Sequence, residues 1–225
     1  MNKKLEKIYE LKSELDYRRP LNQGKIKRIK ENYTIKNIYN SNALEGNTLT
    51  EMETRVIIET DLAVGKKSLK EHLEIRNYNN ALLYIESLRS EILSEENIKT
   101  IHTILLDGID RINKGKYKTT STSQKIQTLL SWYASEPITI NRIIEFICKF
   151  TNIQPFIDGT GRTSKLLINR ELLKLGYPPI TILATDKLEY YQALDKSYYR
   201  DYEEAYDFFY NCIIESLNEY LSFTN

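Results

Sequence analysis

The chain has 225 residues, 41% of them apolar, which is enough to bury the core of one domain. Its 32 basic and 31 acidic residues give a formal net charge of +1, so no global positive field attracts a polyanion and nucleic acid is not an expected partner. No apolar run approaches the roughly eighteen residues of a membrane span, and charges recur through the first ten residues. We therefore expect a cytoplasmic protein without a membrane anchor.

Apolar residues recur at helical spacing along most of the chain. Thr50 with Glu53 three positions later forms a capping-box pattern at a helix start, and Gly65 and Gly176 are placed to end helices. The spacing predicts helices over 1–18, 26–40, 50–63, 69–89, 94–106, 125–134, 142–153, 162–175, 190–194 and 201–217.

The helical pattern is interrupted by residues 109–122, where Gly, Lys, Thr and Ser predict a surface loop or a short hairpin. No strand–helix–strand alternation occurs, so we expect an all-α fold with at most this one small hairpin. In this interpretation residues 1–65 are N-terminal helices attached to a core of residues 66–225. Cys148 and Cys212 are isolated in the sequence, so we expect two core residues rather than a disulfide or a metal site.

One glycine-rich loop lies between two predicted helices, in the segment Gln154–Lys165 with the sequence Q-P-F-I-D-G-T-G-R-T-S-K. The loop leads into a helix N-terminus, where unpaired amides and the helix dipole favour an anion. Gly159 and Gly161 let the backbone approach a phosphate, Asp158 is a candidate ligand for Mg²⁺, and Arg162 offers a bidentate donor. Taken alone, the loop is equally compatible with an ordinary aspartate–glycine turn and a solvated arginine.

The same segment resembles the signature of the Fic family, H-x-F-x-[D/E]-G-N-G-R-x-x-R, and similarity to the family extends from about residue 39 to residue 216. The resemblance implies a Fic fold, and transfer of AMP from ATP to a hydroxyl of a target protein that remains unidentified. It implies ATP and Mg²⁺ as cofactors, with Asp158 as the metal ligand. The nucleotide-binding residues that it implies are Gly159, Thr160, Gly161, Arg162 and Lys165.

Three positions depart from the family signature. Gln154 stands in place of the catalytic histidine, and a carboxamide has no useful basicity near neutral pH. Thr160 replaces an asparagine, and Lys165 replaces the second arginine, so a planar fork becomes a point charge. Neither His72 nor His102 is a convincing substitute base, and we expect His102 to pack or cap within its helix. Nucleotide binding is therefore expected, with transfer impaired or altered.

A second motif precedes the loop, because the segment 41–47 resembles the family's inhibitory motif [S/T]-x-x-x-E-[G/N]. The resemblance makes Ser41, Glu45 and Gly46 inhibitory residues, with Ser41 holding the helical turn. Glu45 is expected to pair with Lys165 and to occupy the site of the γ-phosphate. The alternative is a helix that simply ends in a surface charge. Family members with this arrangement often form homodimers, which adds a homodimer to the expectations.

The sequence leaves three functions open. The first is an autoinhibited adenylyltransferase whose activity is limited by Gln154. The second is a catalytically inactive regulator or interaction module that keeps the fold as a scaffold. The third is a hydrolase that removes AMP from a modified protein, using Glu45 and Asp158. Residues 115–124 occupy the place of the family's target-docking flap, but they look short, and a plain solvated loop is an equal alternative.

Overall fold

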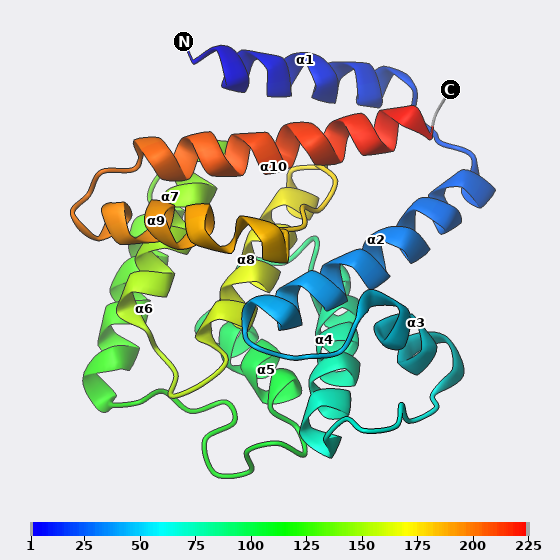
Figure 1. The fold of residues 1–225 in the computed structure, drawn as a ribbon. Coiled ribbons are helices and arrows are strands. Elements are labelled where there is room, and N and C mark those ends of the chain that lie inside the picture. Colours follow the sequence, from blue (N-terminus) through cyan, green and yellow to red (C-terminus); the bar gives the residue numbers. More distant parts are fainter. Residues whose placement is uncertain (1, 224–225) are drawn as a thin grey trace.

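A computed structural model describes residues 2–223 of the chain. Met1 and residues 224–225, the outer ends of the predicted N-terminal helix and of the core, lie outside the described residues. The described part consists of α-helices and one short 3-10 helix, without a strand (Figure 1), so the expected all-α fold is confirmed. The α-helices are α1 (Lys3–Tyr17), α2 (Gln23–Leu44), α3 (Glu51–Thr60), α4 (Leu69–Ser87), α5 (Glu95–Leu105), α6 (Thr120–Ala134), α7 (Ile140–Ile153), α8 (Thr160–Lys174), α9 (Lys187–Tyr198) and α10 (Glu203–Ser222).

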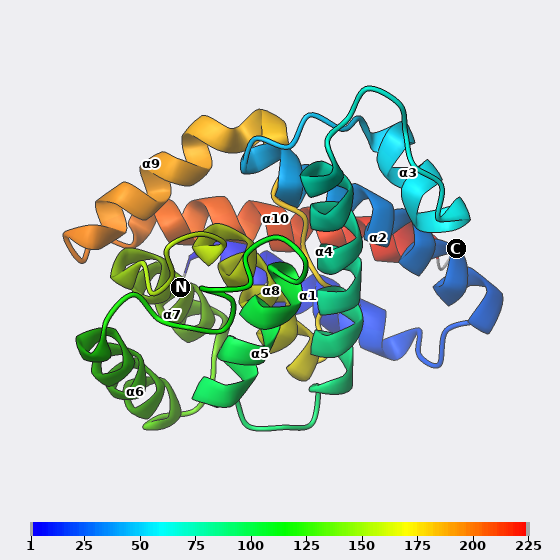
Figure 2. The ribbon, with the colours of Figure 1, turned by 90° about the horizontal axis from the view of Figure 1, so that it is seen from below.

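Helix α8 lies at the centre of the fold, packed against α4, α5 and α7, as Figure 2 shows from below. Every residue from Thr160 to Leu172 except Gly161 is buried. Even its polar residues are enclosed: Arg170 pairs with Glu171 inside the protein, and Tyr133 donates a 2.7 Å hydrogen bond to the same carboxylate. A helix buried on all sides is rigidly held, and so is the loop at its N-terminus.

The N-terminal helices share the core of the rest of the chain. Helix α1 lies along α10 (Figure 1) and buries Ile8, Leu11 and Leu15. Helix α2 is attached through Asn37, whose side-chain amide donates a 2.9 Å hydrogen bond to the carbonyl of Ile180. Its C-terminal end reaches the start of α8. The fold therefore places the turn after α2 beside the glycine-rich loop.

Several predicted boundaries were wrong. Helix α2 ends at Leu44 and not at residue 40, α9 spans Lys187–Tyr198 and not 190–194, and α10 ends at Ser222 and not at residue 217. Helix α3 begins with the predicted Thr50–Glu53 capping box, but it ends at Thr60 and not near residue 63. Asp61 ends it in the left-handed region (φ 61°), a conformation that aspartate tolerates, and its carbonyl accepts a 2.7 Å hydrogen bond from Arg76. Helix α6 begins at Thr120 and not at residue 125, because a threonine–serine run carries little helical signal.

The loop before α6 contains no hairpin among the described residues. Its end lies against the glycine-rich loop: the backbone N–H of Lys118 donates a 2.9 Å hydrogen bond to the carbonyl of Pro155, and Tyr117 packs on Phe156 with ring centroids 5.2 Å apart. The chain then enters α6 after Thr119. Of the predicted alternatives, loop or hairpin, the loop is observed.

Two further expectations concern the helices as a whole. None of the described helices is both long and apolar enough to cross a membrane. Cys148, on α7, and Cys212, on α10, are both buried, as expected of core residues.

Candidate functional site

The glycine-rich loop is shaped by two residues with left-handed backbone. Gln154 caps the C-terminus of α7 with φ 48°, and its N–H donates to the carbonyl of Thr151. Gly159 (φ 80°) is the N-cap residue of α8 and contributes no capping side chain. A non-glycine residue in this region costs free energy, so Gln154 is held there by its surroundings. The loop turns the chain from α7 into α8, with Phe156 buried beneath it.

His102 supports this loop from below. Its ring stacks on Phe156 with centroids 3.6 Å apart. Its Nδ1 accepts the N–H of Gly115 (2.9 Å), so its Nε2 carries the proton and donates to the carbonyl of Asp158 (2.9 Å). Burial lowers the pKa of His102. Both ring nitrogens are therefore used to join the loop to the segment before α6, and the expected packing within its own helix was wrong.

The first turn of α8 presents donors without acceptors. No hydrogen bond from the backbone N–H groups of Thr160, Gly161 and Arg162 is present within the described residues. The Arg162 side chain, 3% exposed, pairs with Glu74 (3.1 Å) and Asp158 (3.4 Å). Its Nε and Nη1 make no hydrogen bond to described residues. A buried guanidinium with spare donors beside free amides fits the oxygens of a phosphate.

Thr160 contributes differently from its neighbours. Its side chain is buried, and its hydroxyl accepts the N–H of Phe156 at 3.3 Å. The side chain thus supports the loop from inside. Only the backbone N–H of Thr160 faces the candidate phosphate site.

Glu45 lies over this turn. It follows the end of α2, and its Oε1 accepts a 2.6 Å hydrogen bond from Nζ of Lys165, so the pair predicted from the sequence is present. The Lys165 side chain is 3% exposed and that of Glu45 27%, and burial lowers the pKa of the lysine. A Cβ atom on Gly161 would collide with the Glu45 carboxylate. The carboxylate therefore occupies the space directly above Gly161.

The turn after Glu45 is connected to Arg162 through Glu74. Gly46 adopts φ 96° and lets the chain reverse, and the side-chain amide of Asn47 donates a 2.9 Å hydrogen bond to Glu74. Sequence reasoning missed Glu74, because nothing in the spacing of α4 marks it. The hydroxyl of Ser41 donates a 2.7 Å hydrogen bond to Tyr78 on α4, and no hydrogen bond from it to Glu45 is present among the described residues. The expectation that Ser41 holds the turn directly was wrong, since Ser41 holds α2 against α4.

A different environment lies on the other side of the loop. The side chain of Gln154 is exposed, makes no hydrogen bond to the described residues, and borders a hollow of about 500 Å³. Of the two histidines in the chain, neither lines this hollow. Asp195 is the one titratable carboxylate among the described residues that line it.

Asp158 is the metal ligand that the sequence predicts. Its carboxylate is half exposed and accepts a 2.6 Å hydrogen bond from the N–H of Gly159. The described residues contain no group of three or more His, Cys, Asp or Glu side chains that could hold a metal. A single carboxylate fits Mg²⁺ only when phosphate oxygens and water complete its shell. Any metal here would therefore arrive with a nucleotide.

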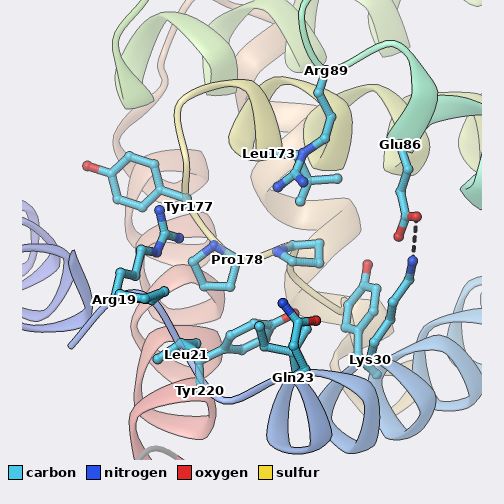
Figure 3. Close-up of a pocket in the computed structure, with 14 residues that line it drawn as sticks. Arg19, Leu21, Gln23, Lys30, Glu86, Arg89, Leu173, Tyr177, Pro178 and Tyr220 are labelled. Carbon is cyan, nitrogen blue, oxygen red and sulfur yellow. Dashed lines mark hydrogen bonds and ion pairs between the residues drawn. The ribbon is translucent and has the colours of Figure 1, made fainter.

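The C-terminal end of α8 borders a separate hollow of about 740 Å³. In Figure 3, Arg89 lies above this hollow and Arg19 lies at its left, beside Tyr177. Lys30 pairs with Glu86 at 2.6 Å. The hollow shares no residue with the loop 154–165. It is therefore not part of the candidate site.

Comparison of the sequence and the fold with known proteins identifies similar proteins of one family. Residues 92–172 match the Fic/DOC family. The chain is 33% identical to the "Protein adenylyltransferase Fic" of Nematostella vectensis, over 98% of the chain and 56% of that protein, and 32% identical to the protein of that name from Drosophila melanogaster, over 88% and 44%. The chain thus spans about half the length of these relatives.

Solved structures agree with the sequence relatives. A Fic-domain signalling protein of Bacteroides thetaiotaomicron superposes with a TM-score of 0.90 at 26% identity, covering 97% of each chain. Fic-1 of Caenorhabditis elegans superposes with a TM-score of 0.91 at 25% identity, over 98% of this chain and 71% of that one. The loop that leads into α8 lies within the matched segment, and the chain belongs to the Fic/DOC family.

Proposed function

We propose that the chain is a nucleotide-binding protein of the protein-adenylyltransferase type, which binds ATP with Mg²⁺ and transfers AMP to a protein hydroxyl. The relatives named as protein adenylyltransferases support the reaction class. The observation that carries the proposal is the buried Arg162 beside free amides at the start of α8. That combination of fixed positive charge and unpaired donors has an anion as its natural partner.

Different residues are proposed to bind the phosphates and the metal. The first-turn amides and Arg162 would hold phosphate oxygens, and Asp158 would hold Mg²⁺ beside them. The bound Mg²⁺ would neutralise charge that develops on the phosphates during transfer. Lys165 would contribute a further positive charge once it is released from Glu45.

Glu45 is proposed to restrain the protein. Its carboxylate fills the space above Gly161 and neutralises Lys165. A phosphate group entering that space meets a negative charge within contact distance, which raises the free energy of binding. Displacement of Glu45 is therefore proposed to precede productive binding of ATP.

Gln154 is proposed to limit the transfer step. Its amide can orient an acceptor hydroxyl, but it cannot take the proton when the oxygen attacks the α-phosphate. The proton must leave to water or to the phosphate itself. Transfer is therefore proposed to be slow even after Glu45 has moved.

Incorporation of label from ATP tests the reaction class. The Glu45→Gly variant is incubated with a cell extract and with ATP labelled at either the α- or the γ-phosphate. Transfer of AMP incorporates the α label and not the γ label. Glu91→Gly, which removes an exposed glutamate outside the loop 154–165, serves as the control and should match the wild type. Incorporation of γ label, or ATP binding to neither variant, contradicts the proposal.

A non-catalytic regulator is the second candidate, and Gln154 is the observation in its favour. In that case ATP binds and stabilises the protein, but no label is incorporated even by Glu45→Gly. The regulator would use the nucleotide as a signal only. A melting shift with ATP and Mg²⁺, measured beside the incorporation assay, separates the two candidates.

A further inference from the structure

The hollow beside Gln154 continues into a second hollow. The first, about 500 Å³, lies between α7 and α9, and the second, about 780 Å³, lies between α6, α7 and the end of α9. Both include Asn152 and Tyr198, so they adjoin. We call them together the α6–α9 groove. It extends from Lys125 and Trp132 on α6, past Asn152 and Tyr198, to Gln154 and Leu188.

Exposed apolar side chains gather along this groove. Leu188, Tyr191 and Tyr198 on α9 all line it, and each is more than 40% exposed. Trp132, the single tryptophan of the chain, lines its other end from α6. A row of exposed aromatic and aliphatic side chains beside a candidate site is the usual composition of a recognition surface.

The charge of the groove is mostly positive. Lys125, Lys149 and Arg200 line it, against a single acidic residue, Asp195. Lys149 lies over the Trp132 ring at 4.2 Å and pairs with Glu145 at 3.0 Å, whereas Lys125 and Arg200 have no ion pair within the described residues. The complementary partner therefore carries acidic groups beside apolar ones.

The loop before α6 leaves the groove open. Because α6 starts at Thr120 and no hairpin precedes it in the described part, the first turns of α6 form the rim, through Ser121 and Gln124. An extended chain could pass from Trp132 to Gln154 without meeting a covering segment. The groove thus ends at the position where an acceptor hydroxyl is needed.

We propose that the α6–α9 groove docks the acceptor, an extended segment of a target protein that carries acidic and aromatic or aliphatic side chains. This inference rests on the proposed function, since Gln154 marks the acceptor side. Single-stranded nucleic acid is the alternative occupant, which the test below separates from a protein segment. Leu188, at the Gln154 end of the groove, suits an aliphatic contact rather than base stacking.

Trp132 provides a direct reporter of docking, because it is the only tryptophan. A random copolymer of glutamate and tyrosine is titrated into the protein without nucleotide while Trp132 fluorescence is recorded. We expect saturable binding that weakens with added salt, and no comparable binding of a lysine–tyrosine copolymer. The double variant Lys125→Glu/Arg200→Glu should weaken binding by about tenfold or more.

The matched control is Lys27→Glu/Lys66→Glu. It makes the same change in net charge at two exposed positions outside the groove, and Lys66, like Arg200, has positive φ. The control should bind like the wild type. Tyr198→Ser, which removes an exposed ring at the shared part of the groove without disturbing the core, should also weaken binding, by about tenfold.

Three results overturn the proposal: no binding of the glutamate–tyrosine copolymer, equal binding by both double variants, or tighter binding of a single-stranded oligothymidine. The last would make the groove a nucleic-acid site. A melting shift with ATP and Mg²⁺ judges the proposed function separately. If Lys125→Glu/Arg200→Glu keeps that shift and loses copolymer binding, the docking proposal stands; if no variant shows the shift, the nucleotide proposal fails alone.

Discussion

The two sides of the loop that leads into α8 differ in what fills them. On the phosphate side, two nearly buried cations, Arg162 and Lys165, are each paired with a carboxylate supplied by another helix or turn. On the acceptor side, Gln154 is exposed beside an open groove. One side is enclosed, whereas the other is open and has a glutamine where the family signature has a histidine. In the proposed function, binding and transfer therefore depend on separate parts of the site, and each can be altered without the other.

The largest effect is expected on the acceptor side. Gln154→His, in a Glu45→Gly background, restores a group able to take the acceptor proton, and we expect transfer to rise by about 10²- to 10⁴-fold. The measurement is the initial rate of α-label incorporation. Gln154→Asn provides the control, since it keeps an amide and should leave the rate low. An unchanged rate with histidine would show that the acceptor side lacks more than a base.

On the phosphate side, Arg162→Ala should weaken ATP binding by about 10- to 100-fold, because it removes charge-assisted hydrogen bonds each worth about 1.5–3 kcal/mol. Calorimetric titration with ATP and Mg²⁺ measures the change. Arg76→Ala is the matched control, because Arg76 forms its ion pair with Asp61 at the surface. If both variants bind ATP like the wild type, the buried guanidinium is structural only.

Glu45→Gln should have opposite effects on stability and on binding. It leaves Lys165 buried without its partner, and because Glu45 is partly exposed we expect a loss of about 1–3 kcal/mol in the free energy of unfolding. Urea denaturation measures this loss, with Glu31→Gln at an exposed helix pair as the control. ATP binding should tighten in the same variant. A variant as stable as the wild type would show that the pair is too weak to restrain anything.

The smallest expected effect is the contribution of His102 to the pH dependence of stability. Burial lowers the pKa of His102 in the folded protein, so the unfolded chain binds more protons as the pH falls below about 6.5. Stability should therefore be fully present above that pH and decline below it, towards the lowered pKa. His102→Gln should remove this part of the slope. An unchanged slope in His102→Gln would contradict the role given to His102.

Local patterns explain why the loop and its helices were predictable. The glycines, the aspartate and the arginine of residues 154–165 lie within one turn of each other, and helical spacing placed α7 and α8 around them. The Glu45–Lys165 pair was predicted only from the family's motif order. Glu74, and the contacts that His102 makes outside its own helix, were missed because they join different helices, and no spacing in one sequence encodes such distances.

The displacement of Glu45 by phosphate is the central claim, and ATP affinity tests it most directly. ATP with Mg²⁺ is titrated calorimetrically into the wild type, Glu45→Gly and Glu91→Gly. Each variant loses one glutamate, so the two variants carry the same net charge. We predict that Glu45→Gly binds ATP about tenfold or more tightly than the wild type, and that Glu91→Gly binds like the wild type. Equal affinity in all three proteins, or tighter binding by the wild type, would contradict the account.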